Sequence, residues 1–259
     1  MKFFVDKSDD RNRIAGALLE KEGFEVFEFE EMESICPKVI GGDIIVFSPA
    51  KKFCDREADM FPSGIKIVAG NIEERLWEKL KQKQISHLNL LENEKFAIKN
   101  ANLTAEGVLA IIIEKSRKSM FESRYMIFGG GRIAKALAIL FSKLNLRFSI
   151  VTFNPKKYPD YFLYTDEVYF QNEFVEHLSE YDILINTIPT KFINNGILSK
   201  IEKGTLMIET ASVDCLDREM VGNFEFIPAP ALPKRYSPES AGKVVFETIM
   251  EGLNNGKQN

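Results

Sequence analysis

The segment 125–140 constrains the fold of this chain more than any other. Its apolar first residues lead into three consecutive glycines, and an alanine-rich stretch follows them. Gly129, Gly131 and Ala134 match the pattern G-x-G-x-x-G/A, in which the glycines allow a tight turn and the close approach of a diphosphate, while the third small residue lets a helix pack on the strand. The segment predicts a strand, a turn and a helix whose N-terminus binds a dinucleotide. A plain strand–turn–helix without a ligand is the alternative.

The composition is that of a globular protein. The 259 residues are 45% hydrophobic and 28% charged, which suits buried cores and, at this length, two domains. The net charge of −4 gives no electrostatic case for binding nucleic acid. We find no apolar run of membrane-spanning length and no signal-peptide pattern, so we expect a cytoplasmic protein that does not bind membranes.

Cysteine and histidine are too sparse to predict a metal site. Cys36, Cys54 and Cys215 are widely spaced, which is typical of reduced thiols, and none forms a metal-ligand pair with a neighbour. His87 lies in an expected strand and His177 in an expected solvated helix, and we assign structural roles to both. If the chain is an enzyme, its acid–base group is then a Lys, Glu, Asp, Tyr or bound water.

The first hundred residues alternate strand and helix patterns, which predicts a parallel sheet. The expected strands are 3–5, 24–29, 43–47, 65–69 and 87–91, and the expected helices are 11–22, capped by Asp9 or Asp10, and 72–82. Ligands of such sheets bind beyond the carboxyl ends of the strands. The loops 6–11, 48–50 and 70–71 are therefore candidates for binding a small polar substrate, with ordinary polar loops as the alternative.

A long helix is expected to join two such units. We predict a linker helix at 103–118, with Thr104 as its N-cap and Glu106 in its first turn. After it come six strand patterns, at 125–128, 148–152, 167–170, 182–186, 205–209 and 224–227. Residues 228–233 are proline-rich and expected to be non-helical, and Ser237 and Pro238 begin a final helix.

The fold class predicted from these patterns is α/β. We expect two Rossmann-like domains, each a parallel sheet flanked by helices, joined by the linker helix. The predicted boundaries are 1–100 for an N-terminal substrate domain, 101–121 for the linker helix, 122–233 for a dinucleotide-binding domain and 234–259 for a C-terminal helix. We expect that helix to pack back on the N-terminal domain or the linker helix.

The choice of nucleotide follows from the end of the second strand in the second domain. Proteins that select NAD usually carry a carboxylate there, whereas this strand ends in Thr152, Asn154 and Lys156 with no acid, so we predict NADP over NAD. The loop that begins at Asn186 and contains Pro189 is expected near the nicotinamide, with a strand-to-helix turn as the alternative. The residues predicted to bind the cofactor are Gly129, Gly131, Arg132, Ile133, Thr152, Asn154, Lys156, Asn186, Thr187, Ile188 and Pro189.

Several segments resemble the A-subunit family of dipicolinate synthase. Residues 100–107 are similar to the family's Asn-x-x-x-Thr-x-Glu-Gly segment, and the glycine turn follows in the corresponding place. Residues 185–189, 229–233 and 237–242 resemble the family's loop after the fourth strand and its two later proline-containing segments. Residues 7–12 are more loosely similar to the family's N-terminal Gly-Gly-Asp-Ala-Arg-Gln. The likeness extends over nearly the whole chain.

The resemblance implies an NAD(P)-dependent oxidation of dihydrodipicolinate to dipicolinate, an offshoot of lysine biosynthesis. It also implies a flavoprotein-like partner, the B subunit, and we expect a homo-oligomer. A dianionic substrate needs cationic or N–H partners, and the reaction needs a proton acceptor, for which Glu106 and Lys7 are candidates. The predicted substrate-binding residues are Arg11, Ser48, Gly70, Asn100, Thr104, Lys234 and Arg235.

Departures from the family pattern concern the substrate. The family has Ala-Ser-Arg-Pro-Gly-Gly after its fifth strand, whereas residues 211–216 here contain neither the arginine nor the glycines, and Ala231 and Lys234 replace two further glycines. One alternative is a dehydrogenase of the same architecture with another small substrate. A second is a non-catalytic protein for nucleotide binding or maturation, because residues 128–151 have some likeness to xanthine dehydrogenase accessory proteins.

Overall fold

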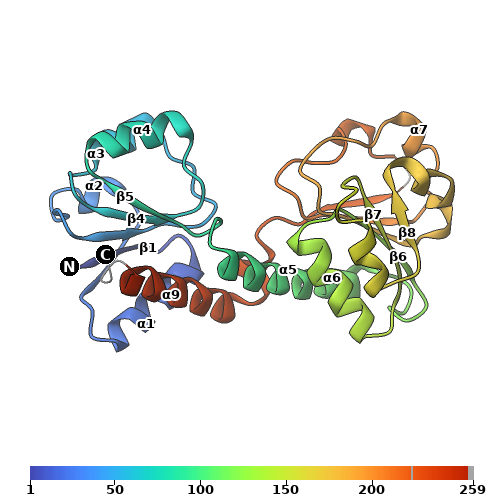
Figure 1. The fold of residues 1–259 in the computed structure, drawn as a ribbon, viewed down its shortest axis with the longest axis horizontal. Helices are drawn as coiled ribbons and strands as arrows, with labels where there is room; N and C mark the ends of the chain where they lie inside the picture. The colour runs from blue at the N-terminus through green and yellow to red at the C-terminus, as the bar shows by residue number, and fades with distance from the viewer. Residues whose placement is uncertain (223, 256–259) are drawn as a thin grey trace. The chain divides into compact units, whose positions relative to one another are not determined.

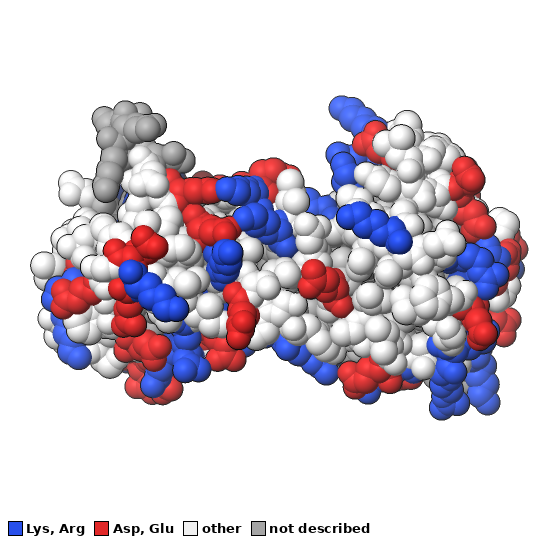
Figure 2. All heavy atoms as spheres, turned by 90° about the horizontal axis from the view of Figure 1, so that it is seen from below, with Lys and Arg blue, Asp and Glu red and all other residues white. Residues whose placement is uncertain are grey.

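The computed structural model describes residues 1–222 and 224–255 (Figure 1). It divides into two compact units, one formed by Met1–Asn100 with the segment that begins at Pro233, and the other by Ala101–Leu232. Each unit contains one parallel sheet flanked by helices, so the predicted fold class, two Rossmann-like domains, is confirmed. On the face shown in Figure 2, acidic and basic side chains are interspersed, in keeping with the small net charge.

The first unit has a five-stranded sheet in the order β2-β1-β3-β4-β5. This is the flavodoxin-like order, whose switch point lies between β1 and β3. The strands are β1 (Phe3–Asp6), β2 (Val26–Phe29), β3 (Ile44–Val46), β4 (Lys66–Ala69) and β5 (Ser86–Asn89). The helices are α1 (Asp10–Lys21), α2 (Met32–Ile35), α3 (Asp55–Met60), α4 (Glu74–Gln82), α8 (Leu232–Tyr236) and α9 (Pro238–Asn255).

Helices cover both faces of this sheet. α1 and α9 lie on one face, and α3 and α4 lie on the other (Figure 1). The central strands are buried along their whole length, as expected for a parallel sheet enclosed on both sides. α9 packs along α1, with Gly242 against Ile14. The ion pairs Lys95–Glu251 and Lys99–Glu247 join α9 to the start of the long helix α5 (Glu94–Lys115).

The long helix α5 (Glu94–Lys115) begins earlier than the sequence predicted. Its first turn is capped by Asn93, whose side-chain oxygen accepts the N–H of Phe96 at 2.9 Å. The predictions that the helix starts at Leu103 and that Thr104 is its N-cap were therefore wrong. Both Asn93 and Thr104 are good capping residues, and the helix-forming residues between them extend the helix back to the first.

The same helix is long and apolar enough to cross a membrane by length and composition. An 18-residue window has a mean hydropathy of 1.4, which corrects the expectation that no apolar run reaches this length. Half of that window is buried within the protein. Val108, Ile111 and Ile112 are among its buried residues, as is typical of a core helix.

The second unit has a six-stranded sheet in the order β11-β10-β9-β6-β7-β8. If the strands β6 to β11 are renumbered 1 to 6 and the sheet is read from β8, this is the order 3-2-1-4-5-6 of dinucleotide-binding domains. The switch point lies between β6 and β9. The strands are β6 (Arg124–Phe128), β7 (Arg147–Thr152), β8 (Val168–Phe170), β9 (Ile183–Asn186), β10 (Leu206–Glu209) and β11 (Glu225–Pro228). The helices are α6 (Arg132–Lys143) and α7 (Asn195–Leu198), with 3-10 segments η1 (Pro159–Leu163), η2 (Gln171–Glu180) and η3 (Arg218–Met220).

Two local predictions in this region had different outcomes. The helix expected around His177 is present as the 3-10 segment η2, with the His177 side chain 44% exposed, so that prediction is confirmed. The prediction that the proline-rich segment 228–233 is non-helical was wrong, because the segment contains the start of α8 at Leu232. Pro233 is tolerated there because the first turn of a helix leaves its N–H groups without intrahelical partners, so a missing N–H costs nothing.

Candidate functional site

The glycine turn joins β6 to α6 at the carboxyl edge of the second sheet. Gly129 has φ +131°, and its N–H donates to the Val151 carbonyl at 2.8 Å. A Cβ at Gly129 would lie 2.0 Å from Thr187 Oγ1. That hydroxyl in turn donates to the Phe128 carbonyl at 2.8 Å. Only glycine fits this conformation and this contact, so the turn is tied to the loop after β9.

The other side of the turn is open. Gly131 is the N-cap of α6, and apart from its neighbours in the chain no described residue has an atom within 4 Å of where its Cβ would be. Because Gly131 has no side chain, it cannot cap the first turn of the helix. N–H groups at such a helix end, with the helix dipole behind them, favour a bound anion. The Tyr161 hydroxyl donates to the Gly131 carbonyl at 3.5 Å, and burial raises the pKa of this phenol to about 12.

A cleft of about 560 Å³ opens in front of this turn, at the switch point of the sheet. Its volume is in the range of small-molecule and cofactor sites. All of the described residues that line it are uncharged. They are Gly129, Gly130, Gly131, Thr152, Phe153, Asn154, Thr187, Ile188, Pro189, Thr190 and Phe192.

Most of the predicted cofactor residues line this cleft, and four do not. Arg132 and Ile133 form the first turn of α6. Lys156 is exposed in the turn after β7, where its N–H donates to Asn154 Oδ1 at 3.0 Å. Asn186 is fully buried, and its amide is bonded within the protein. Asn186 therefore supports the structure around the cleft and is not part of the cleft surface.

Sequence reasoning missed two aromatic residues of the cleft. Phe153 directly follows β7 and is 40% exposed, and its ring centroid lies 5.6 Å from that of Phe192. The two rings meet edge-to-face at 61°, so the exposed ring of Phe153 offers an apolar face against which a nucleobase can pack. The position of Phe153 after the strand could have indicated it. No sequence spacing links Phe192 to Phe153, so their pairing needed the structure.

A lysine borders the glycine turn. Lys157 places its Cβ 3.5 Å from where a Cβ at Gly130 would be, beside Thr152 Oγ1 at 2.7 Å from the same point. Its side chain is exposed. The stem of Lys157 thus lies against the turn, while the lining residues that the structure describes include no carboxylate.

In the first unit, the predicted substrate residue Arg11 forms a buried ion pair. Asp9 is 2% and Arg11 5% exposed, and Arg11 Nη2 lies 2.7 Å from Asp9 Oδ2. Ser48 donates to the same oxygen at 2.7 Å. Burial raises the pKa of Asp9, but Arg11 and Ser48 more than offset this effect, so its pKa lies below the ordinary value. The charge of Arg11 is therefore balanced within the fold, at the switch point between β1 and β3.

The other residues predicted to bind or act on the substrate in the first unit also have contacts within the protein. Lys234 Nζ donates to the Ser8 carbonyl at 2.9 Å, and Lys7 pairs with Glu30 at 3.3 Å. Arg235 stacks on the ring of Tyr236. A Cβ at Gly70 would lie 1.9 Å from the Pro49 carbonyl oxygen, so the loops after β3 and β4 touch there.

Three predicted residues belong to α5. Asn100 is half-buried, Thr104 is buried at 6% exposure, and Glu106 is exposed. Thr104 and Glu106 belong to the second unit, and Asn100 ends the first. Glu106 does not line the cleft, and the proton-acceptor role stays a prediction.

Neither histidine is among the described residues that line the cleft. His87 is on β5, its ring centroid 5.5 Å from that of Trp77, and burial lowers its pKa. His177 contacts Glu180 through Nδ1 at 2.9 Å. Among residues 1–222 and 224–255, no group of three His, Cys, Asp or Glu side chains could hold a metal ion.

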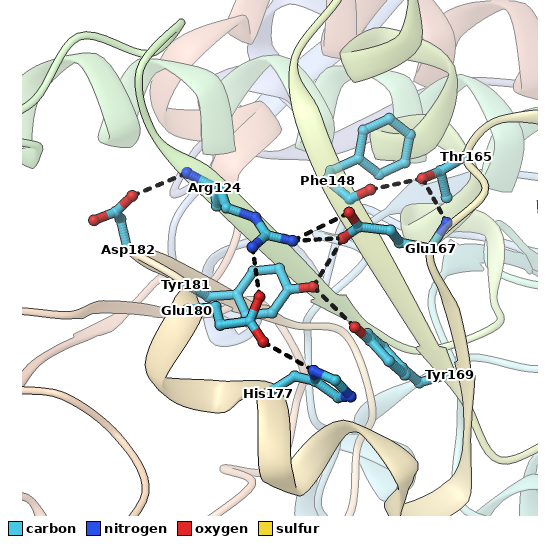
Figure 3. Close-up of polar contacts among 9 residues, drawn as sticks. All are labelled: Arg124, Phe148, Thr165, Glu167, Tyr169, His177, Glu180, Tyr181 and Asp182. Carbon is cyan, nitrogen blue, oxygen red and sulfur yellow. Dashed lines mark hydrogen bonds and ion pairs between the residues drawn. The ribbon is translucent and has the colours of Figure 1, made fainter.

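Glu180 belongs to an ionic network at the amino edge of the second sheet (Figure 3). Arg124, the first residue of β6, donates to Glu180 at 2.6 Å and to both oxygens of Glu167 at 2.9 and 3.1 Å. Its backbone N–H donates to Asp182 at 3.0 Å. The pKa of Glu180 is lowered because His177 and Arg124 donate to it. The network joins the starts of three strands, at the opposite edge from the glycine turn, so we interpret it as structural.

The fold and the cleft define a class of two-domain proteins with a dehydrogenase-type fold. The crystal structure of an L-alanine dehydrogenase is similar with a TM-score of 0.66 and 13% identity, covering 98% of this chain and 89% of that one. No family model matches the chain.

Within this class, the chain is similar to the A subunit of dipicolinate synthase. The crystal structure of that protein from Bacillus subtilis has a TM-score of 0.84 at 18% identity, covering 98% of this chain and 95% of the other. The structure from Bacillus halodurans has a TM-score of 0.80 at 16% identity, covering 97% and 96%. These likenesses show a shared fold.

A curated relative is similar in sequence as well. The A subunit of dipicolinate synthase from Bacillus subtilis (strain 168) is 26% identical over 170 residues, which is 64% of this chain and 57% of the relative. The aligned stretch thus spans less than two thirds of that protein. The resemblance drawn from the sequence motifs is confirmed by these findings.

Proposed function

We propose that this chain is an NAD(P)-dependent dehydrogenase that oxidises dihydrodipicolinate, or a related small dicarboxylate, in the cytoplasm. The observation that carries the proposal is the uncharged cleft at the switch point of the Rossmann-type sheet. The glycine turn and the start of α6, whose N-cap provides no side-chain hydrogen bond, border this cleft. The similarity to the A subunit of dipicolinate synthase supports the choice of substrate class.

The residues of the cleft fit a dinucleotide part by part. The open side of Gly131 and the first turn of α6 suit the diphosphate, because N–H groups and the helix dipole meet there. The rings of Phe153 and Phe192 suit an adenine base. Thr187 and Thr190 offer hydroxyl groups to a ribose or carboxamide. The nicotinamide cofactor, when bound, accepts the hydride.

We further propose NADP as the preferred nucleotide. Among the described residues of the cleft, there is no carboxylate that would bind the ribose hydroxyls and repel a 2′-phosphate. Asn154 provides an uncharged amide after the end of β7. Lys157, whose stem borders the turn, and the exposed Lys156 supply positive charge for a phosphate.

Substrate recognition is proposed to use the carboxyl-edge loops of the first unit, with Glu106 or Lys7 as proton acceptor. Aromatisation favours the loss of hydride, so these residues chiefly need to bind, orient and accept a proton. On the family resemblance, we also propose a homo-oligomer and a flavoprotein-like B subunit. The segment 211–216 differs from the family pattern, and the dicarboxylate is tested by direct assay.

The experiment is a binding and turnover assay on the purified chain. NADP and NAD are titrated by calorimetry, and enzymatically generated dihydrodipicolinate is then added while dipicolinate absorbance is recorded, with and without a B-type flavoprotein. We expect NADP to bind more tightly than NAD and product to form. Nucleotide binding without product would favour another substrate or a non-catalytic role. The absence of binding to either nucleotide would overturn the proposal.

A further inference from the structure

Glu209 is a buried carboxylate that the proposed function leaves without a role. It is the last residue of β10, next to β9 in the sheet, and is 2% exposed. Burying an ionisable group is costly unless its oxygens are well bonded. Its two oxygens lie at the carboxyl edge of the sheet, where the nucleotide cleft is formed, so the groups that bond them can influence the shape of that cleft.

The carboxylate accepts hydrogen bonds from two segments far apart in the sequence. Asn186 Nδ2, at the end of β9, lies 2.8 and 2.9 Å from its two oxygens. The backbone N–H groups of Ala211 and Cys215 each donate to it at 2.9 Å. Glu209 therefore connects the end of β9 to the loop that follows β10.

The first of these connections fixes the start of a cleft wall. Asn186 Oδ1 accepts the N–H of Ile188 at 3.0 Å, and Asn186 Nδ2 donates to the Ile188 carbonyl at 3.0 Å. Ile188 lines the cleft. The side chain of Asn186 thus holds the backbone of Ile188 while Glu209 holds Asn186.

The second connection fixes the end of the same wall. The Cys215 carbonyl accepts the N–H groups of Phe192 at 2.9 Å and Ile193 at 3.0 Å. Phe192 lines the cleft, and the N–H of Cys215 is bonded to Glu209. The wall that runs from Thr187 to Phe192 is therefore anchored at both ends on groups that one carboxylate holds.

We propose that Glu209 is the positioning residue of the nucleotide cleft, fixing the wall 187–192 against the glycine turn through Asn186 and Cys215. This inference rests on the proposed nucleotide-binding function, which it deepens by naming the buried group that shapes the site. A positioned site depends on such supporting bonds, because loosely held walls lose affinity without losing the fold.

The chemistry of the site requires a carboxylate rather than an amide. A carboxylate only accepts, and here it faces the amide NH₂ of Asn186 and two backbone N–H groups. An amide at 209 would direct its own NH₂ at one of these donors and leave that donor unbonded in the interior. Burial and the nearby Glu209 both raise the pKa of Cys215, so its thiol stays protonated beside the carboxylate.

The test compares Glu209→Gln with Glu225→Gln. Glu225 begins β11, the strand next to β10, and is exposed at the opposite edge of the same sheet, so it is a matched control. We expect E209Q to weaken nucleotide binding by about tenfold or more, with E225Q unchanged. In the absence of nucleotide, the amides of Ala211, Cys215 and Phe192 should exchange hydrogen faster in E209Q only.

The outcomes separate this inference from the proposed function. If wild-type protein binds neither NADP nor NAD, the proposed function fails, while the exchange measurement still tests the anchoring. If wild type binds and E209Q binds equally well, the positioning role is refuted. Should E209Q not fold, Glu209→Asp and Asn186→Ala replace it, and wild-type affinity in both would refute the role. Intermediate affinity in Glu209→Asp, which keeps the acceptor, would support it.

Discussion

Alanine at Gly129 should destabilise the fold, whereas alanine at Gly131 should weaken nucleotide binding and leave the fold stable. Gly129 has φ +131°, and its Cβ would lie 2.0 Å from Thr187 Oγ1. An L-residue held in that conformation costs about 1–3 kcal/mol. Moving the Thr187 hydroxyl breaks its bond to the Phe128 carbonyl, which costs about 1 kcal/mol more. Gly129→Ala should therefore lower the free energy of unfolding by roughly 2–4 kcal/mol.

Gly131→Ala should leave the fold intact and damage the site. Gly131 has φ −96°, and outside its chain neighbours no described atom lies within 4 Å of its Cβ position, so the free energy of unfolding should change by less than about 0.5 kcal/mol. The new methyl group would stand where the diphosphate approaches. Overpacking of this kind costs about 1–3 kcal/mol, which raises the nucleotide Kd by roughly 5- to 150-fold.

The assay combines urea unfolding followed by circular dichroism with calorimetric titration of NADP. Each variant is measured in both experiments beside the wild type. If Gly131→Ala binds NADP like the wild type, or destabilises the protein as much as Gly129→Ala does, the predicted separation of stability from binding is refuted. Equal stability of Gly129→Ala and wild type would show that the clash with Thr187 is absent.

Three further predictions concern stability and reactivity. Lys83→Met should lower the free energy of unfolding by about 1–3 kcal/mol in urea titrations, because Lys83 Nζ donates to three backbone carbonyls at the end of α3 within 2.9 Å. Iodoacetamide followed by mass spectrometry should label exposed Cys54 in native protein and Cys215, which is buried with a raised pKa, only after unfolding. Because the pKa of Asp9 is lowered in the fold, its contribution is present above the unfolded value near 3.8 and is lost as pH falls from there through the folded value. Acid titrations of Asp9→Asn should show a lower stability near neutral pH and a shallower loss in this range than wild type.

Local chemistry explains which parts of the site could be predicted from the sequence. A glycine turn between an apolar strand and an alanine-rich helix depends on residues that are neighbours in the chain, and the structure places Gly129 and Gly131 in that turn. The strand ends that follow, at Thr152 and Asn186, could be placed from their apolar patterns in the same way. In a parallel sheet, the carboxyl ends of strands meet at one edge, so the composition of the cleft was largely foreseeable.

The start of α5 and the fate of Arg11 were not foreseeable in this way. Asn93 and Thr104 are both suitable caps, and propensity alone does not choose between them. Arg11 was predicted as an anion ligand because it is a cation in a loop beyond a strand. The structure pairs it with Asp9, a residue two positions away, because the interior requires a buried cation to have a partner.

By itself, the sequence determined the two parallel sheets, the glycine turn and the absence of a carboxylate at the end of β7, because each follows from the order and size of adjacent residues. Only the tertiary structure brought Phe153 beside Phe192 and placed Glu209 against Asn186 and the Cys215 N–H. These contacts join segments that are distant in the chain. Their partners depend on strand order and on the need to bond every buried polar group, and neither is written in a local pattern.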